Sequence, residues 1–500
     1  MKPDELRDHT PKAEEQPVRQ IGHLVGGSQR GDFERTAAVF DPATGEQSAQ
    51  VCLATPDEVG EAVDVAREAF QDWRSSSLAR RAAVLFRFRA LLDEHRDEVA
   101  AAITAEHGKV LSDAAGEVDR GIECAEFACG IPQLLKGGYS AQASTGVDVH
   151  ELRQPLGVVA GITPFNFPAM VPLWMVPNAV ACGNAFILKP SEKDPSASLL
   201  IAELFHRAGL PGGVLNVVQG DAVAVNAILD HPGIAAVSFV GSTPVARHVY
   251  ERGTAAGKRV QALGGAKNHM VVLPDADVDM AADAAVSAAY GSAGERCMAV
   301  SVVVAVGAVS DELVTAIEKR IAGLRIGPGN EPSSQMGPLI TAAHRDKVAS
   351  YLGTAETEGA DVVVDGRDHE FDGDGFFLGV SLVDRVRPDM QVYRDEIFGP
   401  VLSVVRVATA AEAIELVNAN PYGNGTAIFT RDGGAARRFE QDVQVGMVGV
   451  NVPIPVPVAY YSFGGWKDSL FGDRHMYGPE GVGFYTRTKV VTSRWPDPAT

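Results

Sequence analysis

One cysteine stands in a setting that could make its sulfur a nucleophile. Cys297 lies in GSAGERCMA, residues 291–299, which follows an expected helix and precedes an expected strand. Most unpaired cysteines are small buried core residues. Here Arg296 is the neighbour, and a nearby cation favours the thiolate, while the upstream glycines let a substrate approach the backbone. The segment alone is a weak indication of covalent catalysis, and a buried structural cysteine is the alternative.

Asn166 is the second residue whose type fits catalysis. It lies in TPFNFP, residues 163–168, directly after an expected strand. A side-chain amide can donate a hydrogen bond to an oxygen on which negative charge develops. The segment therefore predicts an oxyanion donor, and the alternative is a proline-rich loop that leaves a sheet edge.

Two further segments have the residue types of a nucleotide site. LKPSE, residues 188–192, follows an expected strand and offers Lys189 and Glu192 to ribose hydroxyls or phosphates. FVGSTPVA, residues 239–246, is an expected strand-to-helix turn, and free N–H groups at a helix start favour a phosphate. The alternatives are a solvated charged pair and an ordinary Ser or Thr helix cap.

Short apolar strands that alternate with amphipathic helices must position these residues. From residue 155 the strands LGVVAGI, NAFILKP, GVLNVVQG and AAVSFVGS alternate with helices such as SASLLIAELFHRAG, which is typical of a parallel sheet covered on both faces. A second series begins near His269. It contains the strands MVVL, VSVVVAV, LSVVRV, GTAIFT and GMVGVN and the helices DMAADAAVSAAYG and ELVTAIEKRIAGL. The two series predict an α/β fold of two lobes with a cleft between them.

The region before these series predicts three helices that cover a later sheet. In the first helix, between residues 55 and 101, apolar residues recur at spacings of four and three and therefore share one face: Val59, Val63, Ala66, Phe70 and Trp73. The second has Val84, Leu85, Phe88, Leu91 and Leu92 as its apolar side. The third is expected from about residue 112 to 135.

Composition limits the classes of function. The chain has 500 residues, which predicts two or more domains, and a net charge of −20, which disfavours binding to nucleic acid or to anionic lipid. Its five cysteines form neither a disulfide framework nor a metal-binding CxxC pattern, and that usage suits a reducing cytosol. The polar first 20 residues lack the apolar core of a signal peptide, and no run has the length of a membrane span. We expect a cytoplasmic protein with a flexible N-terminal arm over residues 1–20, no metal and no membrane or nucleic-acid partner.

Taken together, the ordered motifs resemble the aldehyde dehydrogenase superfamily. The four segments above, with ALGGAKN (residues 262–268) and DEIFGPV (395–401), follow one another as they do in that family, over nearly the whole chain. Within it, the sequence is most similar to the CoA-acylating methylmalonate-semialdehyde and malonate-semialdehyde dehydrogenases. The supporting segments are EVDRGIECAEFA, TPFNFPAMVPLWM, GAKNH, GERCMA and YYSFGGWKDSLFGD.

This resemblance implies a three-part subunit. Residues 21–142 and 160–262 would form a Rossmann-type NAD-binding domain, and residues 263–479 an α/β catalytic domain. Residues 143–159 and 480–497 would form a bridging β-element that joins subunits into a homodimer or a homotetramer.

The resemblance also implies roles for individual residues. The Cys297 thiolate would add to the aldehyde, with Asn166 and the Cys297 backbone N–H holding the oxyanion. Glu396 would hold the nicotinamide ribose, and Phe398 would lie against the ring. The other NAD contacts would be Thr163, Phe165, Lys189, Glu192, Lys193, Ser242 and Gly264. Glu192 favours NAD over NADP, because an acidic ribose contact repels a 2′-phosphate.

The expected acceptor of the acyl group depends on a missing residue. Hydrolytic members of the family have a glutamate where the motif comparison places Ala262. Without that base, water is a poor nucleophile toward the thioester, whereas a thiol such as coenzyme A is already partly ionised at neutral pH. The alternative is a hydrolytic enzyme in which another group, such as Glu396 acting through a water, replaces the base.

Two arginines define the expected substrate. In the semialdehyde branch, residues that match Arg120 and Arg296 bind the substrate's carboxylate, and guanidinium suits this planar anion. A 3-oxo acid held in this way could lose CO2 after oxidation, which implies propionyl-CoA or acetyl-CoA as the product. An inactive structural protein on the same fold is the alternative from another class. Ala246, where the family often has glycine, and Phe165, where tryptophan is common, are the two departures from the family pattern.

Overall fold

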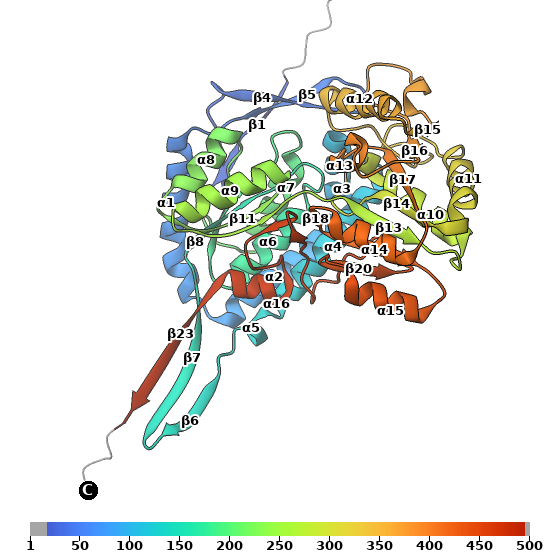
Figure 1. Ribbon diagram of the computed structural model, residues 1–500. Coiled ribbons are helices and arrows are strands. Elements are labelled where there is room, and N and C mark those ends of the chain that lie inside the picture. The colour runs from blue at the N-terminus through green and yellow to red at the C-terminus, as the bar shows by residue number, and fades with distance from the viewer. Residues whose placement is uncertain (1–17, 496–500) are drawn as a thin grey trace, which may run out of the picture.

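Two large, mostly parallel sheets organise the chain (Figure 1). The structure is a computed structural model that describes residues 18–495, so most of the predicted N-terminal arm, residues 1–17, lies outside the described residues. The first sheet has the strand order β22-β12-β11-β8-β9-β10-β2-β3, and the second has the order β15-β16-β17-β14-β13-β19-β20. The two series of strands predicted from the sequence are confirmed.

The first sheet has a parallel centre and antiparallel edges. Its central strands are almost wholly buried, as expected for a sheet covered on both faces: β8 (Val158–Ile162), β9 (Ala185–Lys189), β10 (Leu215–Val217), β11 (Ile234–Val240) and β12 (Arg259–Leu263). The edges are β2 (His23–Val25), β3 (Ser28–Arg30) and β22 (Leu470–Phe471). Segments about 440 residues apart in the sequence, β3 and β22, therefore belong to one sheet.

Nine helices of the described chain accompany this sheet. They are α1 (Pro56–Ser75), α2 (Leu78–Glu94), α3 (Arg96–His107), α4 (Leu111–Cys129), α5 (Ile131–Leu134), α6 (Met170–Ala181), α7 (Ser196–Arg207), α8 (Ala222–Asp230) and α9 (Thr243–Ala255). Helix α1 begins where Thr55 and Glu58 form a reciprocal capping box, and it buries the predicted apolar face. Helix α3 was not predicted. The predicted helix over 112–135 is divided, because Pro132 cannot supply the N–H that would continue α4.

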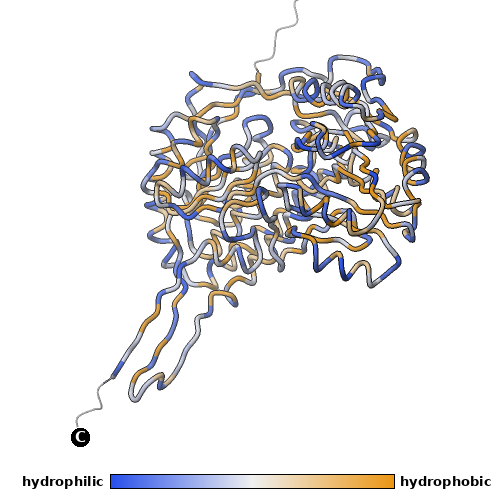
Figure 2. Tube along the Cα trace, in the orientation of Figure 1, coloured by the Kyte–Doolittle hydropathy of each residue, from blue (hydrophilic) through white to orange (hydrophobic). Residues whose placement is uncertain are grey.

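The second sheet is built from the later series. Its parallel strands are β13 (Asn268–Val272), β14 (Val300–Val306), β16 (Ser381–Asp384), β17 (Val401–Val407), β19 (Gly425–Phe429) and β20 (Met447–Val450), and β15 (Asp361–Val364) is an antiparallel edge. Around it are α10 (Val278–Tyr290), α11 (Ser310–Ile321), α12 (Ala342–Glu358), α13 (Gln391–Arg394), α14 (Ala410–Ala419) and α15 (Gly433–Asp442). Figure 2 shows apolar residues along the inner strands and polar residues on the outer helices.

Three small sheets complete the structure. Strands β1 (Arg19–Ile21), β4 (Thr36–Phe40) and β5 (Gln47–Cys52), which precede α1, were not predicted. Strand β18 (Tyr422–Gly423) pairs with β21 (Trp466–Lys467). The arm sheet consists of β6 (Tyr139–Ser144), β7 (Val147–Pro155) and β23 (Thr486–Arg494) and projects from the body after α16 (Gly478–Phe484) (Figure 1).

The strand pairing differs in detail from the domain boundaries expected from sequence. Strand β6 begins at Tyr139 and belongs to the arm sheet, four residues before the expected start of the bridging element, and β8 already belongs to the first sheet at Val158. Strand β22 lies within the expected catalytic range 263–479, yet it pairs with β12 of the first sheet. Among residues 18–495, no helix is both long enough and apolar enough to cross a membrane.

Candidate active site

The site lies where the carboxyl edge of the first sheet meets the amino edge of the second. Strands β8, β9, β11 and β12 lead into Thr163, Pro190, Gly241 and Gly264. Strands β14 and β17 begin shortly after Cys297 and Phe398. The carboxyl ends of parallel strands are the usual place for ligands in α/β folds, because side chains and helix N-termini converge there.

The backbone that carries Cys297 is strained and held in place. Three residues just before it have left-handed backbone angles: Ser292 (φ 49°), Ala293 (φ 52°) and Gly294 (φ 74°). Such angles are costly for residues with a side chain and persist only where surrounding contacts impose them. Asp113 Oδ2 accepts hydrogen bonds from the Ser292 N–H (3.0 Å) and hydroxyl (3.1 Å). The Cys297 carbonyl accepts from the side-chain amides of Asn268 (2.9 Å) and Asn424 (3.0 Å).

The surroundings of Cys297 favour the thiol over the thiolate. Burial and the nearby Glu396 carboxylate raise the pKa of Cys297 to about 12. Backbone N–H groups and Arg296 act in the opposite direction, but Arg296 has the smallest effect. The expectation that Arg296 favours the thiolate is thus correct in sign, and burial outweighs it.

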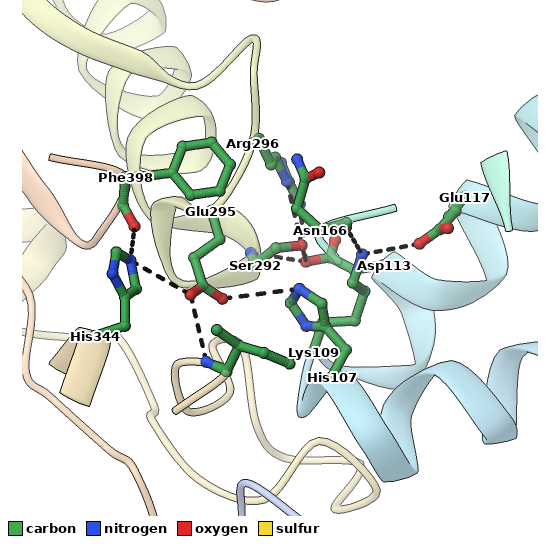
Figure 3. A network of polar contacts seen from close by, with 11 residues as sticks. His107, Lys109, Asp113, Glu117, Asn166, Ser292, Glu295, Arg296, His344 and Phe398 are labelled. Atoms are coloured by element: carbon green, nitrogen blue, oxygen red, sulfur yellow. Dashed lines mark hydrogen bonds and ion pairs between the residues drawn. The ribbon is translucent and has the colours of Figure 1, made fainter. Parts of the chain in front are cut away.

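Asn166 is buried and shares a cavity of about 220 Å³ with Cys297. A buried ion pair fixes its backbone, because Lys109 Nζ donates to the Asn166 carbonyl at 2.6 Å and lies 2.8 Å from Glu117 Oε2 (Figure 3). The other Glu117 oxygen accepts from the N–H groups of Ala169 (2.8 Å) and Met170 (3.1 Å) at the start of α6. Sequence reasoning missed this pair. The one available signal was Glu117 among the apolar positions of its helix.

A second buried network surrounds Glu295, two residues before Cys297. Its Oε1 accepts from the Ile340 N–H at 3.3 Å and lies 3.6 Å from His344 Nε2, while Oε2 lies 3.7 Å from His107 Nε2 (Figure 3). Burial raises the pKa of Glu295 to about 8 and lowers the pKa of both histidines. His344 Nε2 also donates to the Phe398 carbonyl at 2.7 Å, and Phe398 has a left-handed φ of 58°. The network therefore connects the nucleophile segment with Phe398, and sequence reasoning did not find it.

An open cavity of about 500 Å³ continues from the site along the first sheet. Six of the residues expected to contact NAD line it: Thr163, Phe165, Lys189, Glu192, Lys193 and Ser242. The buried Thr163 Oγ1 has no hydrogen-bond partner among residues 18–495, although its residue lines this cavity. Lys189 is buried and donates to the Gly220 carbonyl at 2.7 Å, and Lys193 Nζ lies 4.7 Å from the centre of the Phe165 ring. This cavity has the polar groups and the helix N-terminus of α9 that a dinucleotide requires.

The remaining expected cofactor residues line the narrower 220 Å³ cavity: Gly264, Glu396 and Phe398. Glu396 Oε1 accepts from the Ala266 N–H at 2.8 Å. Burial raises the pKa of Glu396 to about 7 against the opposing effects of that hydrogen bond, Lys267 and Lys347. A Cβ at Gly264 would lie 2.7 Å from the Asp468 carbonyl oxygen, so glycine is required there.

The two expected carboxylate-binding arginines are not in contact with each other. Arg296 pairs with Asp113 (2.8 Å), whereas the exposed Arg120 pairs with Glu123 (3.0 Å) on its own helix. Asp113 and Arg120 are seven residues apart on α4, which puts them on one face and about 10 Å apart. Neither arginine lines the 220 Å³ cavity.

Ala262 does not face the nucleophile. Its side chain is buried in the apolar cluster that also contains Phe239 and Val249. Because side chains alternate along a strand, Leu263 points to the opposite face, toward the core cluster against which Cys297 packs. At the end of β12, where a catalytic glutamate was expected to be missing, the side chains on both faces of the strand are therefore apolar. Residues 18–495 also contain no group of three or more His, Cys, Asp or Glu side chains that could hold a metal ion.

Comparisons with protein families, with characterised proteins and with solved structures give consistent matches. The profile of the aldehyde dehydrogenase family matches residues 29–491. The chain is 58% identical over 482 residues to malonate-semialdehyde dehydrogenase of Pseudomonas aeruginosa, which covers 96% of this chain and 97% of that one. A crystal structure of methylmalonate-semialdehyde dehydrogenase from Oceanimonas doudoroffii has a TM-score of 0.95 at 54% identity, covering 96% of this chain and 99% of that one. A candidate methylmalonate-semialdehyde dehydrogenase from Sinorhizobium meliloti 1021, crystallised with NAD, has a TM-score of 0.95 at 50% identity with the same coverage.

Proposed function

The chain belongs to the aldehyde dehydrogenase family, and from that premise we propose that it oxidises malonate or methylmalonate semialdehyde with NAD and transfers the acyl group from Cys297 to coenzyme A. The observation that carries the proposal is the cavity shared by Cys297 and Asn166 between the two sheets. The names of the relatives at 50–58% identity support the substrate class, and the NAD complex among them supports the cofactor.

Oxidation begins with addition of the Cys297 sulfur to the aldehyde carbon, which turns the carbonyl oxygen into an oxyanion. The side-chain amide of Asn166 makes no hydrogen bond to any residue between 18 and 495, so it is free to donate to this oxygen, together with the Cys297 N–H. Removal of one such donor typically slows catalysis by about 10²–10³. Collapse of the adduct then expels hydride and leaves a thioester on Cys297.

The residues of the two connected cavities suit NAD. Bound NAD supplies the hydride acceptor. The α9 N-terminus at Ser242 would hold phosphate, and Lys189 and Glu192 would bind ribose hydroxyls. Glu396 and Phe398 would bind the nicotinamide end, since they share the narrower cavity with Cys297. His344 would fix the position of Phe398, because its Nε2 donates a hydrogen bond to the Phe398 carbonyl.

Release of the acyl group is proposed to require coenzyme A. Neither Ala262 nor Leu263 offers a carboxylate that could activate water. A thiol needs less activation than water, so thiolysis of the thioester is favoured over hydrolysis. The hydrolytic alternative requires another base near the thioester, and Glu396 is the candidate for it.

A carboxylate on the substrate would bind Arg296. Arg296 Nη2 forms an ion pair with Asp113, and Nε donates a hydrogen bond to the Ser292 hydroxyl at 3.3 Å. Its Nη1 bonds to no residue between 18 and 495. The free Nη1 would bind a substrate carboxylate beside Cys297, which adjoins Arg296 in the sequence, and Arg120 would add a second cation from α4. Once the aldehyde is oxidised, the carboxylate is β to the thioester carbonyl, so loss of CO2 leaves an enolate that the thioester stabilises.

An assay with and without coenzyme A tests this function. We expect NADH formation from malonate semialdehyde to require CoA and to yield acetyl-CoA. The Arg296→Leu variant should raise KM for the semialdehyde at least tenfold and leave KM for propionaldehyde, which has no carboxylate, within twofold. NADH formation that is indifferent to CoA would instead support the hydrolytic enzyme.

The arm sheet is proposed to join two or more copies of the chain. Tyr139, Leu152 and Val490 are large apolar residues on its strands, and each is exposed. A narrow sheet that projects with apolar side chains uncovered is a typical subunit contact. A homodimer or homotetramer follows from this proposal.

A further inference from the structure

The proton on Cys297 has no acceptor in the mechanism described so far. Burial keeps this side chain a thiol near neutral pH, and thiols attack far more slowly than thiolates. The strand position expected to lack a glutamate offers only the apolar Ala262 and Leu263. A base must therefore come from another element.

Three titratable side chains besides Cys297 line the 220 Å³ cavity: His344, Lys347 and Glu396. Lysine in its ammonium form has no lone pair to accept a proton. His344 uses Nε2 to hold the Phe398 carbonyl, and burial lowers the pKa of its ring. Among residues 18–495, Glu396 is the one carboxylate that lines this cavity.

One carboxylate oxygen of Glu396 has no hydrogen-bond donor among residues 18–495. Oε1 accepts from the Ala266 N–H, whereas Oε2 accepts no hydrogen bond from any residue in the described part of the chain. Gly265 makes room for Oε2, because a Cβ at this position would collide with it. A second, enclosed space of about 10 Å³ is also lined by both Cys297 and Glu396, and it is near the minimum size for one water molecule. Because both residues line the same two spaces, a proton can pass between them through this shared volume, either directly or through one water.

We propose that Glu396 is the general base that accepts the Cys297 proton as the sulfur adds to the aldehyde. The S–H bond breaks as the S–C bond forms, the proton moves to Glu396 Oε2, and the electron pair of the carbonyl bond moves to the oxygen near Asn166. The negative charge passes from the carboxylate to the oxyanion, so charge and protons balance. The inference rests on Cys297 as the nucleophile of the proposed function, but it does not depend on the acyl acceptor.

The charged groups around Glu396 are compatible with this role. Lys267, just before β13, and Lys347, on α12, favour its charged form, and Cys297, in the loop before β14, lines the same cavity. Burial has the larger effect and places the pKa of Glu396 at about 7. A base with a pKa near the working pH is the most effective one. A role in ribose binding is separable, because a glutamine at this position can still hydrogen-bond a hydroxyl.

Alkylation of the thiol in the enzyme without NAD or CoA tests the proposal directly. The rate of Cys297 modification by iodoacetamide is measured from pH 5.5 to 10, and the signal of Cys297→Ser is subtracted as background. For Glu396→Gln we expect a rate at pH 7.5 lower by about 10²-fold, within the usual range for a general base, and recovery as the pH approaches that of thiol ionisation. Glu358→Gln is the matched control. Its carboxylate bonds the Gln391 N–H at the start of α13, just ahead of Glu396, and we expect a wild-type rate.

A second variant separates base catalysis from a structural effect. Glu396→Ala leaves space for a small anion, so added formate should restore part of the alkylation rate, and chloride at the same ionic strength should not. A wild-type alkylation rate in Glu396→Gln would overturn the proposal, as would equal rescue by formate and chloride. CoA-indifferent turnover of the wild-type enzyme would contradict the proposed acceptor without affecting either result.

Discussion

Burial controls the protonation of the acidic side chains around Cys297. The pKa of Glu295 is raised to about 8 and that of Glu396 to about 7, and burial is the main cause for both. Glu295 therefore carries a proton at neutral pH and can act as a neutral partner of His107 and His344. Glu396 is poised between its two forms, which suits a proton acceptor.

The raised pKa of Glu295 makes folding stability depend on pH. Between its ordinary value of 4.5 and about 8, the unfolded chain has lost a proton that the folded chain keeps, so this side chain's contribution to stability falls as the pH rises. Glu295→Gln removes that effect. We expect its stability relative to wild type to increase between pH 5 and pH 8.5 by an amount on the order of 4 kcal/mol, measured by urea unfolding. The exposed Glu370→Gln is the control, and equal pH dependence of Glu295→Gln and wild type would contradict the assignment.

Individual residues differed in how well the sequence predicted them. Cys297, Asn166 and the cofactor segments lie directly after or before strands, so the edge of a sheet brings them together, as expected. Asp113 and Glu295 could not be identified, because their partners Ser292, Arg296 and His344 are distant in sequence or depend on strained backbone. The motif comparison did not show which way Ala262 points. Neighbouring residues along a strand point to opposite faces, and here Leu263, not Ala262, belongs to the core cluster against which Cys297 packs.

At the scale of elements, the buried Lys109–Glu117 pair joins three segments. Lys109 follows α3, Glu117 belongs to α4, and together they hold the Asn166 carbonyl and the first N–H groups of α6. Both side chains are fully buried. A buried charge without its partner is costly, so Lys109 and Glu117 stay together and fix the positions of the backbone groups that they bind.

Loss of Lys109 should therefore destabilise the protein strongly. Lys109→Met leaves the Glu117 carboxylate buried without its cation, and breaking a buried pair costs about 3–5 kcal/mol. We expect a loss of that size in urea unfolding. The exposed Arg96–Asp119 pair, whose Asp119 lies on the same helix α4, provides the control, since Arg96→Met should change stability by less than about 1 kcal/mol. If the two substitutions lowered the free energy of unfolding equally, the buried pair would be no more important to stability than the exposed one, which would contradict the prediction.

Long, periodic elements were predicted better than short ones. The expected strands were β8, β9, β10, β11, β13, β14, β17, β19 and β20, and helices α1, α2, α7, α10 and α11 were expected as well, because the apolar residues of these elements follow the period of the element. Strands β1, β4 and β5 are three to six residues long and partly exposed, so their composition gives little signal. Strand β22 has two residues and exists only because β12 offers an edge, so no local pattern could have predicted it.

At the scale of the whole molecule, the arm sheet is the feature that a single chain does not explain. Val490 and Leu152 lie on its long paired strands, and both are more than 40% exposed. If the arm joins copies of the chain, Leu152→Asp combined with Val490→Asp should shift the mass in light scattering from a multiple of 52.8 kDa to the monomer. Met280→Asp, at an exposed apolar position of α10, should leave the mass unchanged. A monomeric wild-type protein would contradict the proposed role of the arm.

The position of β22 has a consequence for synthesis on the ribosome. The first sheet begins with β2 near residue 23 and is completed only when Leu470 and Phe471 pair with β12. In the arm sheet, β7 can pair with β23 only after residues 486–494 have been synthesised. Domains usually fold one after another as the chain leaves the ribosome. Here the N-terminal half cannot finish its sheet until almost all of the polypeptide has been translated. We therefore expect nascent chains stalled before residue 470 to stay protease-sensitive over residues 23–263, and to become protected once the segment through residue 494 has emerged.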